Sequence, residues 1–197
     1  MAGRDGRLRG SRLRRQGPHM IKILPSIERL QECFLYFPAT GELFWKTRPR
    51  EHFATHQGWM TCNSEFAGKL AGSLKQEGYR VVRLFGTIYQ AHRVVWKLMT
   101  GVEPPKSIDH IDMDLDNNRW ENLRAATGTE QKWNMRVRKD SLTGSRGVSL
   151  VCGRWRVQIV VEGKRQHLGY FGSREEAIAA YDVAARSTHG EFYRSPL

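Results

Sequence analysis

The chain has 197 residues, which is room for one medium domain or two small ones and excludes a large multidomain assembly. Its 32 lysines and arginines against 20 aspartates and glutamates give a net charge of +12, typical of chains that bind polyanions, nucleic acid first. The sequence contains no run of about 18 apolar residues, so it predicts no membrane span. The arginine-rich start lacks the apolar core of a signal peptide. We therefore expect a cytoplasmic protein with no membrane partner.

The positive charge gathers at the two ends of the chain. Residues 1–19 hold six arginines and one aspartate, residues 20–135 carry a net +2, and residues 136–197 carry a net +5. The first segment has almost nothing to bury, which predicts a disordered basic arm. Two interpretations of this arm stay open: it grips phosphates non-specifically, or it is a leader that precedes Met20.

The cysteine pattern argues against disulfides and structural metal. Cys33, Cys62 and Cys152 stand far apart, and no C-x-x-C pair occurs. This spacing predicts neither a disulfide framework nor a cysteine-ligated site, so we expect no structural zinc. The three thiols are expected to be reduced side chains that take part in packing.

The first elements in chain order are one helix and one strand. Ser26 is a suitable N-cap, and apolar residues recur at helical spacing over 27–37, where Pro38 ends the helix. Residues 43–45 form a strand-like apolar run. The glycine-punctuated stretch that follows, to about residue 74, shows little periodicity, and we assign it no element.

Two histidines in that stretch, His52 and His56, have the i, i+4 spacing of ligands on one helix face. Gly58 and the weak periodicity around them favour ordinary surface or core histidines over metal ligands. His92, farther along the chain, is interpreted as a structural histidine as well.

Two strands and a helix come next. Residues 79–84 and 87–90 read as strands joined through Phe85-Gly86, and residues 92–99 read as a helix that Gly101 ends. The strands are short and adjacent in the chain, so they predict a hairpin that precedes the helix.

The next segment has the order strand, loop, strand, helix. A short apolar strand around residues 107–111 leads into a loop dense in carboxylates and amides. Thr127 and Glu130 then form a capping-box pattern, which starts a helix that runs to about Arg138.

The C-terminal segment predicts three antiparallel strands packed on one helix, after a polar linker at residues 139–144. The strands span 147–151, 154–161 and 165–168, and the turns between them are Cys152-Gly153 and Glu162-Gly163. Ser173 and Glu176 form a second capping box, and Gly190 closes the helix. The whole chain is therefore expected to be of the α+β class.

An Asp-His pair, Asp109-His110, lies at the centre of the loop segment. Hydrolysis of a phosphodiester needs an activated water and a cation on the scissile phosphate, and an aspartate beside a histidine is a minimal supplier of both. Successive strand residues point to opposite faces, so the two serve one site only where the chain bends or twists. A lone Asp-His pair is more often a surface turn, and only its surroundings reverse that interpretation.

The nearby carboxylates allow a second interpretation, a calcium loop over Asp109, Asp112, Asp114 and Asp116. The glycine and the terminal glutamate of such a loop are absent at the required spacing, which disfavours it.

At these residues the sequence resembles the HNH endonucleases of the homing type, which occur in phages and mobile introns. The segments that carry the resemblance are Ala91–Trp96, Ile108–Asp112, Asp116–Arg124, Ala126-Thr127 and Asn134, within a match that runs from about residue 30 to residue 138. The resemblance implies a ββα-metal nuclease domain over residues 20–138, with its core at about 90–138.

The resemblance also implies residue roles. Asp109 would bind a divalent metal, Mg²⁺ or Mn²⁺, His110 would be the general base, and Asn122 would brace the loop that orients the histidine. The helix would complete the metal site with Gln131 or Asn134. Gln131 departs from the family, which usually has a metal-binding asparagine there. A glutamine keeps the amide oxygen but adds a methylene, so it would hold the metal less firmly.

The C-terminal strands carry a basic face. Arg154, Arg156 and Gln158 alternate with apolar residues, which suits a sheet laid into the major groove, where arginine reads guanine and glutamine reads adenine. A solvated sheet face with no partner is the ordinary alternative.

A second resemblance favours DNA binding by this segment. The residues Arg146–Val148, Gly153–Trp155, His167–Phe171 and Glu175–Ala185 resemble the Apetala/ethylene-response-factor DNA-binding domain of plant transcription factors, over about 145–193. It implies a DNA-binding domain at 145–197 that presents Arg146, Arg154, Arg156, Gln158, Arg165 and His167 to the groove. Ser149, Val160 and His167 differ from the plant pattern, so the plant target does not transfer. Trp155 and Tyr181 are expected in the core.

Two functions follow from the sequence. The first is a metal-dependent endonuclease that acts on double-stranded DNA, as a monomer and with no small-molecule substrate, in a bacterial or phage-infected cell. The second is a sequence-specific DNA-binding or regulatory protein in which the nuclease half is an inactive scaffold.

Overall fold

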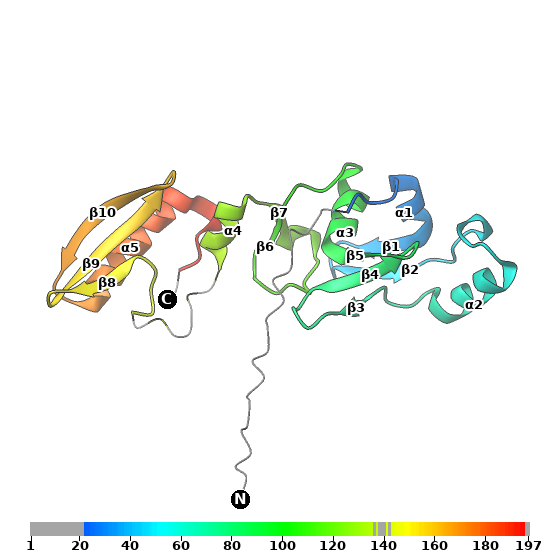
Figure 1. Ribbon diagram of the computed structural model, residues 1–197, viewed down its shortest axis with the longest axis horizontal. Coiled ribbons are helices and arrows are strands. Elements are labelled where there is room, and N and C mark those ends of the chain that lie inside the picture. Colours follow the sequence, from blue (N-terminus) through cyan, green and yellow to red (C-terminus); the bar gives the residue numbers. More distant parts are fainter. Residues whose placement is uncertain (1–21, 136, 138–140, 142, 196–197) are drawn as a thin grey trace, which may run out of the picture.

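A computed structural model describes residues 22–135, 137, 141 and 143–195; the predicted arm at 1–19 lies outside this range. The fold is α+β, with several small antiparallel sheets. In Figure 1 a helix, α2, lies at one end of the molecule, and a three-stranded sheet lies at the other. Within the described residues, no helix combines the length and the apolar character needed to cross a membrane.

The first helix is shorter than its apolar spacing predicts. Helix α1 spans Ile27–Cys33, and strand β1 begins at once and spans Phe34–Phe37. It pairs antiparallel with β2, Glu42–Trp45. The prediction of helix to residue 37 was therefore wrong. Aromatic residues fit a pleated sheet well, and a neighbouring strand gave the run Phe34–Phe37 a partner that periodicity alone does not reveal.

The stretch with no assigned element contains a short 3-10 helix, η1 (Arg50–His52), and helix α2 (His56–Phe66). Thr55 caps α2, because its side chain accepts a hydrogen bond from the Gly58 N–H at 3.0 Å. No residue of α2 is buried. Its sequence therefore lacks the apolar stripe that would have made the helix visible.

A three-stranded sheet and helix α3 follow. The sheet has the order β3-β4-β5, with strands Ser73–Leu74, Arg80–Leu84 and Thr87–Gln90. Helix α3 spans Ala91–Thr100 and ends at Gly101, where φ is +76°. The hairpin and the helix agree with the prediction.

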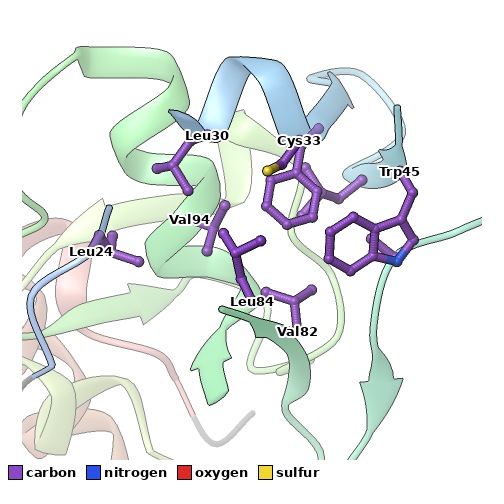
Figure 2. Packing of buried hydrophobic residues seen from close by; sticks show 10 residues of the cluster. Leu24, Leu30, Cys33, Trp45, Val82, Leu84 and Val94 are labelled. Atoms are coloured by element: carbon purple, nitrogen blue, oxygen red, sulfur yellow. The ribbon is translucent and has the colours of Figure 1, made fainter. Parts of the chain in front are cut away.

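Helix α3 joins two hydrophobic clusters. Figure 2 shows the larger one, in which Val94 packs with side chains from α1, β2 and β4; the labelled members are Leu24, Leu30, Cys33, Trp45, Val82, Leu84 and Val94. The next residue, Val95, is fully buried with Ile108 and Leu123 in a second cluster. The second cluster fixes the strands around residue 108 against α3 and so sets the position of the Asp-His pair.

The segment with the Asp-His pair has the predicted order. It consists of β6 (Ile108–His110), a loop with the 3-10 helix η2 (Trp120–Asn122), β7 (Leu123–Ala125) and α4 (Gly128–Asn134). Both hydrogen bonds of the Thr127–Glu130 capping box are present. Helix α4 ends at Asn134 rather than near Arg138, because Met135 has an extended backbone.

The C-terminal unit, residues 143–195, is the predicted sheet on a helix. Strands β8 (Val148–Val151), β9 (Arg154–Val161) and β10 (Lys164–Phe171) form one antiparallel sheet. Helix α5 (Arg174–His189) covers one face of this sheet, and the 3-10 helix η3 (Gly190–Phe192) follows it (Figure 1). Both X-Gly turns have positive φ at both residues, as a type I′ hairpin turn requires.

Candidate functional site

Asp109 is the acidic group of the site, and it is buried in an ion pair. On β6 it lies opposite Arg124 of β7, which donates from Nε and Nη2 to Asp109 Oδ2 at 3.0 and 2.9 Å. From α4, Asn134 Nδ2 lies 3.1 Å from Oδ2 and 3.3 Å from Oδ1. Asp109 is only 8% exposed. The burial cost of this carboxylate is therefore offset by charge-assisted hydrogen bonds, most of them on Oδ2.

His110 is buried more deeply, at 2% exposure. Its Nε2 lies 3.4 Å from Asn118 Oδ1, and its ring meets the edge of the His92 ring at 5.1 Å between centroids. Tyr79 packs beside both rings. The pKa of His110 is lowered, mainly by burial, against the opposing effects of the Asn118 hydrogen bond and nearby aspartates. The imidazole is thus neutral at neutral pH, which is the form that accepts a proton.

The two residues of the pair have separate sets of partners. Asp109 contacts β7 and α4, whereas His110 contacts α3 and the loop, as expected of neighbours in a strand. One bridge joins them: Asn134 Nδ2, which contacts the Asp109 carboxylate, also donates to the His110 carbonyl at 2.9 Å. Asn134 therefore ties both residues of the pair to α4.

Asn122 lies across the base of the loop. Its Oδ1 accepts from the Asp112 N–H at 3.0 Å, and its Nδ2 donates to Asp112 Oδ1 and to the Asn117 carbonyl. Its own carbonyl accepts from the Ile111 N–H at 3.0 Å. These bonds fix the chain directly after His110, which is the geometry that a loop brace requires.

The remaining loop carboxylates are engaged within the protein. Asp112 and Asp114 each accept from the backbone N–H two residues on, and Asp116 pairs with both Nε and Nη2 of Arg80 at 2.8 Å. Across the ranges that the structure describes, no three His, Cys, Asp or Glu side chains gather as a metal cluster. These contacts give the calcium interpretation no support.

A hard divalent cation binds oxygen donors, and Asp109 carries the carboxylate of this site. Such an ion typically takes one or two carboxylates, with water and substrate phosphate as the other ligands. Asp109 is a carboxylate of this kind, whereas Asn134 directs its Nδ2 at Asp109 and would offer its oxygen only if the amide turned. Gln131 Nε2 is instead bound to the Ile108 carbonyl at 3.0 Å. Of the two predicted amides, Asn134 is the one that contacts the carboxylate.

Comparisons with known proteins assign a family to the segment that holds the Asp-His pair. A family model described as HNH endonuclease matches residues 89–132, from the last residues of β5 into α4. Protein 3.8 of Escherichia phage T7 is 36% identical over 108 residues, which cover 52% of this chain and 87% of that protein. The chain contains an HNH endonuclease domain. The HNH domain thus includes Asp109, His110, Asn122 and Gln131.

A second relative is more distant. A protein of Acanthamoeba polyphaga mimivirus, named an uncharacterized HNH endonuclease, is 29% identical over 122 residues. The match covers 60% of this chain and 63% of that protein, so this chain spans less than two thirds of it. No solved structure matches the chain significantly.

The basic residues predicted for DNA binding share one open face of the C-terminal sheet, with one exception. The register pairs Gln158 with His167 across β9 and β10, and Arg165 lies opposite Val160 on the same face. Tyr170 lies beside this row: its ring meets that of His167 at 4.9 Å, and the Arg154 guanidinium lies 6.0 Å from its centre. The face thus combines cations with an aromatic side chain.

Arg156 has an unused donor on that face. Its Nε is buried and has no hydrogen-bond partner among the described residues. Arg156 lies between Ser149 of β8 and Tyr170 of β10.

Arg146 is the exception, because the structure turns it away from the sheet face. Its guanidinium donates to the carbonyls of Lys132, Trp133 and Met135, at and just beyond the last turn of α4. These contacts satisfy carbonyls that a helix end leaves free. Arg146 therefore belongs to the junction between the HNH domain and the C-terminal unit.

Other singled-out side chains have structural surroundings. Cys33 Sγ lies 3.6 Å from His52 Nδ1, and His52 Nε2 contacts Glu32 at 2.7 Å. Burial raises the pKa of the Cys33 thiol to about 11, which favours the protonated form at neutral pH. His56 packs near Trp59. Tyr181 and Trp155 belong to the core as predicted, whereas Cys152 is exposed in a turn and does not pack.

Two residues near the Asp-His pair, Arg124 and Asn118, escaped sequence reasoning, and the contact that His92 makes with His110 was not predicted. Arg124 lies within a recognised motif, yet only the strand register shows that it faces Asp109. Asn118 is 2% exposed and contacts His110, although it reads as one more amide of a polar loop. His92 was interpreted as structural; it packs on His110, and burial, then the nearby His110 and Arg93, lower its pKa to about 3.

Proposed function

We propose that this HNH protein is a divalent-metal-dependent endonuclease of the homing type, which cuts double-stranded DNA held by its C-terminal sheet. The observation that carries the proposal is the Asp109 carboxylate set against Asn134 of α4, within the strand-loop-strand-helix segment of an HNH domain. HNH nucleases generally use a divalent metal ion, and an oxygen donor set of this kind suits Mg²⁺ or Mn²⁺.

Asp109 and Asn134 would hold the ion. When bound, it would polarise the scissile phosphate and neutralise charge on the departing 3′ oxygen. Asp109 provides the charge that retains a cation in this site, and Asn134 links that charge to the backbone of His110. Gln131 acts through the Ile108 carbonyl, so its role is to fix α4 against β6.

His110 is the proposed general base. With the Nε2 proton directed at Asn118 Oδ1, the lone pair of Nδ1 is available to take a proton from water. Asn118 and His92 hold the ring on two sides, and Asn122 fixes the chain that follows it. Since the ring is only 2% exposed, proton transfer requires the neighbouring loop to open when DNA enters.

The C-terminal sheet is the proposed DNA-binding surface. Arg154, Arg156, Gln158, Arg165 and His167 share its open face, which suits contacts to base edges and phosphates in the major groove. The likeness to the Apetala/ethylene-response-factor domain supports this role.

A metal-dependence assay tests this proposal. Supercoiled plasmid that carries the gene with its flanking DNA is incubated with EDTA-treated protein, alone and after addition of Mg²⁺ or Mn²⁺. We expect nicked or linear DNA only after metal addition, and none with His110→Ala. Intact plasmid in every reaction, or equal cleavage by wild type and His110→Ala, would contradict the proposal.

A second function is favoured by two specific observations: His110 is buried, and the Asp109 carboxylate is paired with Arg124. Both suit a DNA-binding regulator whose HNH domain serves as a scaffold. Such a protein would bind its DNA equally well with and without EDTA, and His110→Ala would bind as the wild type does. Cleavage in the plasmid assay separates the two functions.

A further inference from the structure

The residue that holds Asp109 is itself held by the C-terminal unit. Arg124 uses Nε and Nη2 on Asp109, and its third nitrogen, Nη1, donates to the Glu191 carbonyl at 2.7 Å. The Phe192 ring covers the guanidinium, with 3.9 Å between Cζ and the ring centre. A chain segment 67 residues away thus encloses Arg124.

Three further contacts fix that segment in place. The Trp133 ring at the end of α4 stacks on His189 at the end of α5, at 4.1 Å and with an angle of 9° between the rings. Arg146 caps the carbonyls at the end of α4. Arg194 reaches the Asp112 carbonyl in the loop after His110, at 3.4 Å. The C-terminal unit therefore contacts α4, β7 and the loop.

We propose that Glu191 and Phe192 complete the nuclease centre by holding Arg124 as a positioning residue for the Asp109 carboxylate. This inference rests on the proposed function and adds to it. The C-terminal unit serves in DNA binding and also supplies the support on which the metal-binding carboxylate depends.

The contacts explain how the support works. Both hydrogen bonds from Arg124 to Asp109 are made to Oδ2, so this oxygen is held in place. Within the described part of the chain, Oδ1 receives only the 3.3 Å contact from Asn134. Oδ1 is therefore the oxygen presented to a cation. Without the contacts from Glu191 and Phe192, the Arg124 side chain would adopt many rotamers. The Asp109 carboxylate would then no longer be held in one orientation.

The test compares three variants of the full chain with matched controls. Phe192→Ala removes the ring above Arg124, Phe192→Tyr restores a ring, and Arg124→Gln removes the guanidinium. Arg119→Gln removes a charge from an exposed position of the neighbouring loop, and Val183→Ala alters an exposed residue of α5. Mn²⁺ affinity is measured by electron paramagnetic resonance, beside single-turnover cleavage of plasmid and DNA affinity.

We expect Phe192→Ala and Arg124→Gln to lower Mn²⁺ affinity and the cleavage rate by about 10- to 100-fold, the usual effect of losing a support to a metal ligand. DNA affinity should stay at the wild-type value, because the open sheet face is untouched. Phe192→Tyr, Arg119→Gln and Val183→Ala should behave as wild type does.

Failure of this inference differs from failure of the proposed function. If Asp109→Asn abolishes Mn²⁺ binding while Phe192→Ala and Arg124→Gln retain wild-type affinity, the support by the C-terminal unit is refuted and the nuclease proposal stands. An increase in Mn²⁺ affinity in these two variants would also refute it. If Asp109→Asn binds Mn²⁺ as wild type does, the metal site itself is wrong, and the inference falls with it.

Discussion

The HNH centre and the C-terminal sheet use polar side chains in opposite ways. Asp109, His110 and Asn134 are each less than 10% exposed, and every one is hydrogen-bonded to a neighbour inside the protein. On the sheet, Arg154, Arg165 and His167 are exposed. A buried, paired group depends on its partners for its geometry, whereas an exposed cation acts alone by its charge. Single substitutions should therefore abolish function in the centre and only weaken it on the sheet.

The strongest test of this contrast replaces a carboxylate in the centre and one in the loop. Asp109→Asn removes the charge that retains a cation and should lower cleavage by at least about 100-fold, because the metal supplies several kcal/mol of charge stabilisation. Asp112→Asn should lower cleavage far less and should lower the melting temperature, since Asp112 acts on His110 only through the loop that Asn122 braces. Cleavage rates and thermal melts are compared; equal cleavage losses would contradict the assignment.

A second test compares the two amides of α4. Asn134→Ala should lower Mn²⁺ affinity by about 10- to 100-fold, because Asn134 contacts the Asp109 carboxylate. Gln131→Ala should have a smaller effect on Mn²⁺ affinity, since its amide reaches the Ile108 carbonyl. Calorimetric titration with Mn²⁺ measures both. The reverse order would make Gln131 the metal ligand that the family resemblance implies.

On the C-terminal sheet, single substitutions should weaken DNA binding by steps rather than abolish it. Arg154→Ala and Arg156→Ala should each weaken duplex binding, and each lost phosphate contact should reduce the slope of log K against log salt by about 0.9. Arg146→Ala should leave that slope unchanged, because its guanidinium caps α4. Binding titrations at several salt concentrations measure the slope for each variant. A reduced slope for Arg146→Ala would return this residue to the DNA-binding face.

The smallest expected effect is a pH dependence of stability at the junction between the two regions, where Trp133 stacks on His189. Burial lowers the pKa of His189, so the unfolded chain, with an ordinary value of 6.5, binds the proton more readily. Stability from this residue is therefore present above pH 6.5 and is lost as the pH falls below it. Melting temperatures between pH 7.5 and 5.5 should fall less in His189→Phe, which keeps a ring against Trp133. Equal slopes for both proteins would contradict this.

The sheet on its helix was predictable because its signals are local. Alternation over Arg154–Val161, two X-Gly turns and the Ser173 capping box each depend on a few adjacent residues. Strand β1 was missed because its aromatic residues continue the helical spacing of α1, and α2 was missed because it buries nothing. Sequence patterns predict a helix or strand reliably only where its main contacts are with residues nearby in the chain.

The candidate site was likewise predictable only where its residues belong to one local motif. Asp109, His110 and Asn122 could be named from a motif in one stretch of chain. The contact of Arg124 with Phe192 and the turn of Arg146 toward α4 could not, because each depends on how the C-terminal unit packs on the HNH domain. The burial of His110 depends likewise on α3, which the hydrophobic contact of Val95 with Ile108 holds in place.

One separation-of-function measurement tests the central claim most directly: DNA affinity and single-turnover cleavage on the same duplex, with Mg²⁺, for His110→Ala and Arg156→Ala. His110→Ala should bind with wild-type affinity and fail to cut, whereas Arg156→Ala should bind more weakly and cut at the wild-type rate once DNA is saturating. Cutting by His110→Ala at the wild-type rate would contradict the claim.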